Sequence, residues 1–355
     1  MPVNTERPTT AAGRLALPCE MAQVDDWLGE PAAGVVARLV RHPGPFVVLG
    51  AGGKLGLHLC VMLKRALAAG GRDDAVIAIS RYRTLRDRGE FARRGIEARS
   101  GDLTDAALVS ALPEAPTVFF LAGVKFGTAS QPELLAAINE RMPQIVAERY
   151  RRSRIIALST GCVYPFVAPE SGGATEETPP APPGAYARSC LQRERAFQEV
   201  SARWGTPVAL IRLNYAVEFR YGVLLDIAEK VWRREPVDLA MGYVNVIWQR
   251  DALAQVIQSL ELAGSPPVPV NITGPEILSV RAIARRLGEL LGVPVQFRGT
   301  EAPTAWLSNS RRARSRFGDP PTSLETMLTW VAAWLQHGGE VWGKPTGFER
   351  RDGNY

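Results

Sequence analysis

Short apolar runs alternate with longer amphipathic stretches over the first two thirds of the chain. The apolar runs have the length of buried strands, and the stretches between them have the length of helices. The predicted strands are 46–49, 75–79, 95–100, 117–122, 154–158 and 207–213, and the main predicted helices are 57–69, 134–150 and 186–204. Strands that alternate with helices in this way predict an α/β fold with a parallel, doubly wound sheet.

The pattern becomes mixed after Asn214. The sequence there predicts one strand and several helices of moderate length. They are the strand 268–272 and the helices 223–233, 252–261, 279–291 and 324–336. We interpret this part as a smaller, mixed α/β C-terminal domain.

A glycine-rich turn follows the first predicted strand and precedes the first long helix. Gly50 permits the tight turn, Gly53 lets the backbone approach a pyrophosphate, and Gly56 lets the helix pack on the strand. The unpaired N–H groups at the helix N-terminus suit an anion. This context predicts a Rossmann-like fold with a dinucleotide bound at the turn. The predicted contacts are Gly50, Gly52, Gly53, Lys54, Leu55 and Gly56, with Lys54 meeting phosphate.

These signals divide the chain into four parts. Residues 1–44 are an N-terminal extension with short helices, and 45–215 are the dinucleotide-binding domain. Residues 216–345 form the substrate-binding domain, part of which returns to the sheet near 245–260. Residues 346–355 are a tail.

The end of the second strand indicates which dinucleotide binds. A site specific for NAD usually has an acid here for the ribose 2′-hydroxyl, whereas this chain has Ser80 and Arg81. Arg81 offers a bidentate fork for a 2′-phosphate, so we expect a preference for NADP(H), with NAD(H) as the alternative. Asp102, after the third strand, is suited to a helix cap and to an adenine contact.

Composition limits the class of protein. The 355 residues are 46% hydrophobic and carry a net charge of +6, with arginines spread among acids rather than gathered in a stripe. This distribution favours an anionic small molecule over nucleic acid. The four cysteines show neither metal-ligand spacing nor a disulfide framework. No signal peptide or membrane-length apolar run is found, so we expect a cytoplasmic protein with no bound metal.

The chain resembles the extended short-chain dehydrogenase/reductases, also called NAD-dependent epimerase/dehydratases. The resemblance runs from about residue 46 to about residue 334 and is carried by the glycine turn and several short motifs. These are Gly101-Asp102-Leu103, Phe120-Leu121-Ala122-Gly123, Ser159-Thr160-x-x-Val163-Tyr164, Ala185-Tyr186-Ala187, Arg212-Leu213-Asn214 and Asn271-Ile272-Thr273-Gly274-Pro275.

The resemblance implies hydride transfer between a substrate carbon and nicotinamide. Thr160 matches the hydroxyl that holds the substrate oxygen, and Tyr186 matches the general acid/base. Further implied cofactor contacts are Leu103, Leu121, Ala122, Gly123, Tyr186 and Cys190. The helices 134–150 and 186–204 resemble the family's dimer surface, which implies a homodimer.

Position 190 departs from the family. A lysine is expected four residues after the tyrosine, and this chain has Cys190. Three interpretations stay open. In the first, another cation substitutes, and Lys125 is our preferred candidate among the five lysines. In the second, Cys190 is a buried apolar residue in a site without turnover. In the third, the charge of the nicotinamide itself perturbs Tyr186.

Two patches are similar to the GDP-4-keto-6-deoxymannose epimerase-reductases (GDP-L-fucose synthases), namely 121–127 and 162–165. The similarity implies that Cys162 acts as an acid/base beside a carbonyl. That family also uses a histidine of the substrate domain, and none of the three histidines of this chain stands at a matching place.

The expected catalytic residues are therefore Tyr186, Thr160, Lys125 and Cys162. Asn214 and Arg220 are expected to join Thr160 and Cys162 in contacting substrate. The predicted activity is that of an NAD(P)-dependent oxidoreductase or epimerase acting on a hydroxyl or keto carbon of a sugar or nucleotide-sugar-like substrate. The alternative is a dinucleotide-binding sensor or partner protein without turnover.

Overall fold

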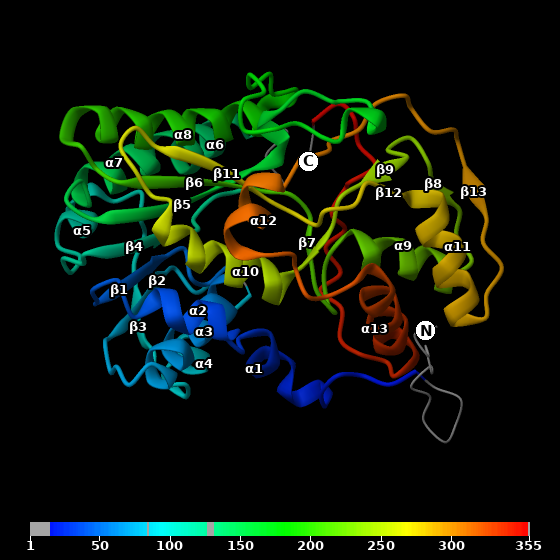
Figure 1. The fold of residues 1–355 in the computed structure, drawn as a ribbon, viewed down its shortest axis with the longest axis horizontal. Helices are drawn as coiled ribbons and strands as arrows, with labels where there is room; N and C mark the ends of the chain where they lie inside the picture. Colours follow the sequence, from blue (N-terminus) through cyan, green and yellow to red (C-terminus); the bar gives the residue numbers. More distant parts are fainter. Residues whose placement is uncertain (1–14, 84, 126–130, 354–355) are drawn as a thin grey trace.

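The computed structural model describes residues 15–83, 85–125 and 131–353 (Figure 1). The start of the predicted N-terminal extension, the end of the predicted tail and Phe126-Gly127 of the fucose-synthase-like patch lie outside these residues.

A seven-stranded parallel sheet forms the larger part of the molecule (Figure 1). Its order is β11-β6-β5-β4-β1-β2-β3, and every neighbouring pair is parallel. The strands are β1 (Phe46–Leu49), β2 (Val76–Ser80), β3 (Glu97–Ser100), β4 (Thr117–Phe120), β5 (Arg154–Thr160), β6 (Val208–Leu213) and β11 (Val268–Ile272). The predicted doubly wound sheet is confirmed. The strand predicted after Asn214 extends it beside β6.

Helices cover both faces of the sheet because successive strand residues face opposite sides. Phe46 and Val48 of β1 share one core with helices α2, α3 and α10, whereas Val47 and Leu49 share another with α5, α7 and α8. The helices of this part are α2 (Ala33–Leu39), α3 (Gly56–Ala69), α4 (Arg88–Ala92), α5 (Ala106–Ser110), α6 (Pro132–Leu135), α7 (Met142–Arg149), α8 (Gly184–Trp204), α10 (Gln249–Gln258) and α12 (Arg311–Phe317).

A smaller part packs against the carboxyl end of the sheet and is built around α9 (Val223–Trp232), α11 (Val280–Leu291) and α13 (Leu324–Gln336). It also carries pairs of short strands. The pairs are β7 (Ala216–Val217) with β10 (Ile247–Trp248), β8 (Val237–Asp238) with β13 (Phe297–Arg298), and β9 (Tyr243–Val244) with β12 (Leu278–Ser279). The 3₁₀ turns among the described residues are η1 (Met21–Gln23), η3 (Gly161–Val163), η4 (Pro169–Ser171) and η5 (Ser259–Glu261).

Segments from both ends of the chain lie between these two parts. Helix α1 (Val24–Leu28) places Asp25 against two guanidinium groups, at 2.8 Å from Arg86 and 2.7 Å from Arg220. After α13, the chain continues as a coil that we name the C-terminal strap (residues 339–353). In Figure 1 it is the red segment that passes between the sheet and the part that carries α9 and α11.

The predicted helix 134–150 is interrupted by a π-helical segment, η2 (Ala136–Arg141). The wider turn holds Asn139, which is fully buried. Its side chain accepts from Val124 N (3.0 Å) and Arg193 Nη2 (2.7 Å), and it donates to Val124 O (2.9 Å) and Ser189 Oγ (2.9 Å). Asn139 therefore fixes the loop after β4 to helix α8.

We expect Asn139→Leu to lower the free energy of unfolding by about 2–4 kcal/mol, because the Val124 backbone groups and Nη2 of the buried Arg193 lose these bonds. Chemical denaturation measures this loss. Asn309→Leu is the control, since partly exposed Asn309 makes two side-chain bonds that water can replace. An equal loss in both variants would contradict this role of Asn139.

Candidate active site

The glycine-rich turn joins β1 to α3 at the carboxyl edge of the sheet, where ligands of doubly wound folds bind. Gly50 has a φ of +83°, and a Cβ on it would lie 2.6 Å from the backbone of Ala122. A Cβ on Gly56 would lie 2.1 Å from the carbonyl oxygen of Ala51. Only glycine fits at either position.

The turn also leaves room for an anion. A Cβ on Gly53 would meet only the carbonyl oxygen of Gly50, at 3.4 Å. Helix α3 begins after Leu55 with no side-chain cap, so its first N–H groups are available to a phosphate. These features fit the pyrophosphate of a dinucleotide.

Lys54 projects from this turn toward the smaller part. Its Nζ lies 3.0 Å from the centroid of the Tyr221 ring. Burial lowers the pKa of Lys54 to about 7, and the nearby positive charges of Lys125 and Lys344 add to this effect.

Beside the turn, β2 and β3 end in the residues predicted to hold the adenosine half of the cofactor. A Cβ on Gly52 would lie 2.7 Å from Ser80 Oγ, so this hydroxyl lies directly against the turn. Arg81 Nη1 lies 3.8 Å from Asp102 Oδ2, and both side chains are partly exposed. Asp102 accepts hydrogen bonds from the backbone and hydroxyl of Thr104, while Leu103 is buried.

The loop after β4 brings Lys125 to the Tyr186 ring. Leu121 and Ala122 lie partly buried beside β1, and Gly123 packs so closely on Arg193 that a Cβ there would lie 2.4 Å from the guanidinium. Lys125 Nζ lies 5.8 Å from the centroid of the Tyr186 ring and donates to the carbonyl oxygen of Thr346 (3.3 Å). Burial lowers the pKa of Lys125.

Tyr186 lies in the first turn of α8 and is partly buried. Burial raises the pKa of its phenol well above the ordinary value, and the thiols of Cys190 and Cys162 raise it further, against the field of Arg193. Cys190 is fully buried among Val163, Tyr164 and Ala174, and burial raises the pKa of its thiol too. At neutral pH the phenol is therefore a proton donor.

Thr160 ends β5 next to the short turn η3. Its hydroxyl accepts from the N–H of Cys162 (3.2 Å), which leaves its own hydrogen to donate. Asn214 directly follows β6 and lies beside this turn, since a Cβ on Gly161 would lie 3.1 Å from Asn214 Cβ. Thr160, Cys162 and Asn214 thus lie together, with Cys162 and Asn214 buried.

Arg220, which is expected to contact substrate, lies among acidic side chains of the chain itself. Its guanidinium is buried and contacts Glu218 (3.2 Å) and Asp25 (2.7 Å), and it lies 4.9 Å from the centroid of Trp342. In this arrangement its charge is balanced within the protein.

Two features of this edge were missed in the sequence. One is Asn139, which the sequence does not distinguish from the other polar residues of the helix 134–150, such as Gln144 and Glu148. The other is the C-terminal strap, which contacts Lys125 through Thr346. Neither belongs to a motif, and each contact joins residues far apart in the chain.

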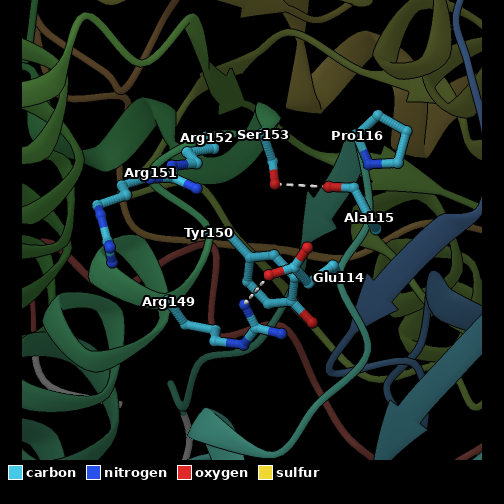
Figure 2. A pocket seen from close by; sticks show the side chains of 8 residues that line it. All are labelled: Glu114, Ala115, Pro116, Arg149, Tyr150, Arg151, Arg152 and Ser153. Carbon is cyan, nitrogen blue, oxygen red and sulfur yellow. Dashed lines mark hydrogen bonds and ion pairs between the residues drawn. The ribbon is translucent and has the colours of Figure 1, made fainter.

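A separate hollow of about 290 Å³ opens at the opposite, amino-terminal edge of the sheet (Figure 2). It lies directly before β4 and β5. Its lining is Glu114, Ala115, Pro116, Arg149, Tyr150, Arg151, Arg152 and Ser153. Ligands of parallel sheets bind at the carboxyl ends of strands, so this hollow is distinct from the candidate site.

Within residues 15–83, 85–125 and 131–353, no group of three or more His, Cys, Asp or Glu side chains is arranged to hold a metal ion. In the same part of the chain, no helix has the length and apolar character needed to cross a membrane.

Solved structures show the same fold at low sequence identity. MoeE5 in complex with UDP-glucuronic acid and NAD is 22% identical, with a TM-score of 0.67, over 83% of this chain and 100% of that one. UDP-glucose 4-epimerase of Thermotoga maritima with UDP-glucose is 17% identical, with a TM-score of 0.68, over 82% and 99%. UDP-glucuronic acid 4-epimerase of Bacillus cereus with NAD is 18% identical, with a TM-score of 0.68, over 82% and 98%.

Sequence comparison gives the family. No curated protein matches the chain significantly. Residues 46–217, which run from β1 to β7 and include the glycine turn, Thr160 and Tyr186, match the model of the NAD dependent epimerase/dehydratase family. This match assigns residues 46–217 to the NAD-dependent epimerase/dehydratase family.

Proposed function

We propose that the chain is an NAD(P)-dependent oxidoreductase or epimerase that acts on a hydroxyl or keto carbon of a sugar or nucleotide-sugar-like substrate. The observation that carries this proposal is the approach of Lys125 Nζ to within 5.8 Å of the Tyr186 ring centroid, at the edge that bears the glycine turn. The match of residues 46–217 to the family supports it. The similar structures carry UDP-glucuronic acid or UDP-glucose, which supports a nucleotide sugar as the first substrate class to test.

The proton chemistry follows from the burial of the phenol. Because the pKa of Tyr186 is raised, the neutral phenol can donate its proton to the oxygen of a keto group. Lys125 then stabilises the phenolate that remains, in place of the lysine absent at position 190. Thr160 donates its hydroxyl hydrogen to the same substrate oxygen. A bound nicotinamide supplies or accepts the hydride.

The thiol of Cys162 and the amide of Asn214 complete the proposed substrate side. Both are buried beside Thr160, and Cys162 lies near enough to affect the pKa of Tyr186. We assign Cys162 to proton exchange at a carbon beside the carbonyl, and Asn214 to a polar contact with the sugar.

Arg81 supports NADP(H) as the cofactor, because its half-exposed guanidinium follows β2 where a 2′-phosphate would lie. The ion pair between Arg81 and Asp102 supports NAD(H), since the carboxylate can accept from a ribose hydroxyl, and the similar structures contain NAD. Affinities for the two oxidised cofactors separate these alternatives.

A second candidate function is a dinucleotide-binding protein without turnover. The buried thiol of Cys190 favours it, because a neutral group cannot supply the positive field that the family lysine gives. This candidate keeps the glycine turn and gives Tyr186 no chemical role.

Turnover separates the two candidates. We expect the wild-type protein to convert a nucleotide-linked sugar from a panel of UDP and GDP sugars, measured by the absorbance of the nicotinamide band for net oxidation or reduction and by chromatography of the sugar for epimerisation. Tyr186→Phe should lower that rate by about 10²–10⁴-fold while cofactor binding, measured by thermal shift, is kept. The control is Tyr150→Phe, whose hydroxyl bonds Pro113 O at the opposite edge of the sheet. Binding without turnover across the panel would favour the second candidate.

The depressed pKa of Lys54 predicts a pH dependence of pyrophosphate binding. An anion binds the charged ammonium, so the protein must take up a proton when it binds above pH 7, and the affinity for ADP should fall as the pH rises from 6 to 8.5. Calorimetry in two buffers of different ionisation enthalpy measures the proton uptake. In Lys54→Arg the guanidinium stays charged, so the dependence should vanish. An unchanged dependence in this variant would remove Lys54 from the phosphate site.

A further inference from the structure

The C-terminal strap crosses the carboxyl edge of the sheet and meets the proposed site at several points. Thr346 lies at its centre and is buried. The carbonyl oxygen of Thr346 accepts from Lys125 Nζ (3.3 Å), while its backbone N–H (2.7 Å) and its hydroxyl (2.5 Å) both donate to Asp226 Oδ2. The strap therefore links the proposed cation to α9.

Aromatic side chains fasten the strap on both sides of Thr346. Phe348 is 1% exposed and belongs to the same buried cluster as Cys162 and Ala187. Trp342 stacks on Tyr221, with the ring centroids 6.3 Å apart, and the backbone N–H of Trp342 donates to the carbonyl oxygen of Arg220 (3.2 Å). Tyr221 is the ring that Lys54 of the glycine turn covers.

The far end of the strap closes against the start of helix α8. A Cβ on Gly184 would lie 2.7 Å from Gly353 Cα, so the two backbones touch two residues before Tyr186. Arg351 donates to the carbonyl oxygen (2.6 Å) and hydroxyl (2.8 Å) of Thr304. Glu349 pairs with Lys230 at 3.2 Å.

We infer that the C-terminal strap is an internal competitor that occupies the end of the cleft where the nicotinamide and sugar of the proposed function would lie. The strap contacts Lys125 of the loop after β4 and the start of α8, two residues before Tyr186, and its Lys344 lies near enough to lower the pKa of Lys54; Ser80 and Arg81 follow β2, two strands beyond β4 in the sheet. An ADP moiety can thus bind with the strap in place. Groups that extend to Tyr186 must displace it.

The contacts are compatible with such displacement. Burial raises the pKa of Asp226 to about 6, so this acceptor carries a desolvation cost that water would relieve if the strap left. Release also exposes Phe348 and frees Trp342, and the loss of this apolar burial opposes displacement. The hydroxyl bond from Thr346 to Asp226 is one contact of the strap that a single substitution can remove.

Binding of two nucleotides tests the competition, which rests on the proposed function. The probes are ADP and NAD⁺, and the variant Thr346→Val removes the hydroxyl bonded to Asp226 at nearly constant volume. We expect NAD⁺ to bind the wild-type chain no more tightly than ADP, and Thr346→Val to increase the affinity for NAD⁺ relative to ADP about tenfold. Thr326→Val, which loses an exposed hydroxyl at the start of α13, should leave the ratio unchanged. The ratio cancels any general loss of folded protein.

Amide hydrogen exchange on the full chain shows whether the strap opens or closes when NAD⁺ binds. NAD⁺ should accelerate exchange at Thr346 and Phe348 if it competes with the strap. Slower exchange on adding NAD⁺ would show a lid that closes over the ligand and would overturn the inference, as would an unchanged affinity ratio in Thr346→Val.

A measurement without ligand separates this inference from the proposed function. Phe348 shares a cluster with Cys162, so Thr346→Val should speed the alkylation of Cys162 by iodoacetamide about tenfold, whereas Thr326→Val should not. If neither nucleotide binds, the proposed function fails. Faster alkylation would then still support the strap as a cover, and an unchanged rate would reject it.

Discussion

The central constraint in this structure is the buried phenol of Tyr186. One turn further along helix α8, position 190 carries no cationic side chain. Burial keeps the proton on Tyr186, and the thiol at position 190 cannot oppose that effect. Positive charge reaches the ring from Arg193, two turns along α8, and from the loop after β4, where Lys125 Nζ lies 5.8 Å from the ring centroid. Asn139 fixes this loop to α8 by bonding Val124 and Arg193, so the interruption of one helix positions a side chain beside another.

The two ends of the chain reinforce the same edge. Asp25 of the N-terminal helix α1 contacts Arg86 and Arg220, and both guanidinium groups also lie over the ring of Trp342 in the strap. Charge burial of this kind is costly unless every group is paired. The extension and the strap are therefore joined through these two guanidinium groups.

The sequence was sufficient for features set by local backbone geometry. Gly50 and Gly56 occupy positions where a Cβ cannot fit, and the alternation of strands and helices predicted the doubly wound sheet that the structure has. Long-range contacts were not predictable. The bond from Lys125 to Thr346 joins residues 221 positions apart, and the π-helical turn at Asn139 depends on partners in two other elements. The roles of Tyr186, Thr160, Cys162 and Asn214 stay predictions. So do the homodimer and the cytoplasmic location.

The most direct test of the account is a rescue of the displaced cation. The rate of turnover is measured with the nucleotide sugar that the wild-type protein converts. It is compared in the wild type, in Lys125→Met and in the double variant Lys125→Met/Cys190→Lys. If Lys125 supplies the field that position 190 lacks, the single variant loses about 10²-fold or more and the double variant regains most of the rate. A full rate in Lys125→Met would contradict the account, because the phenol would then function without that ammonium.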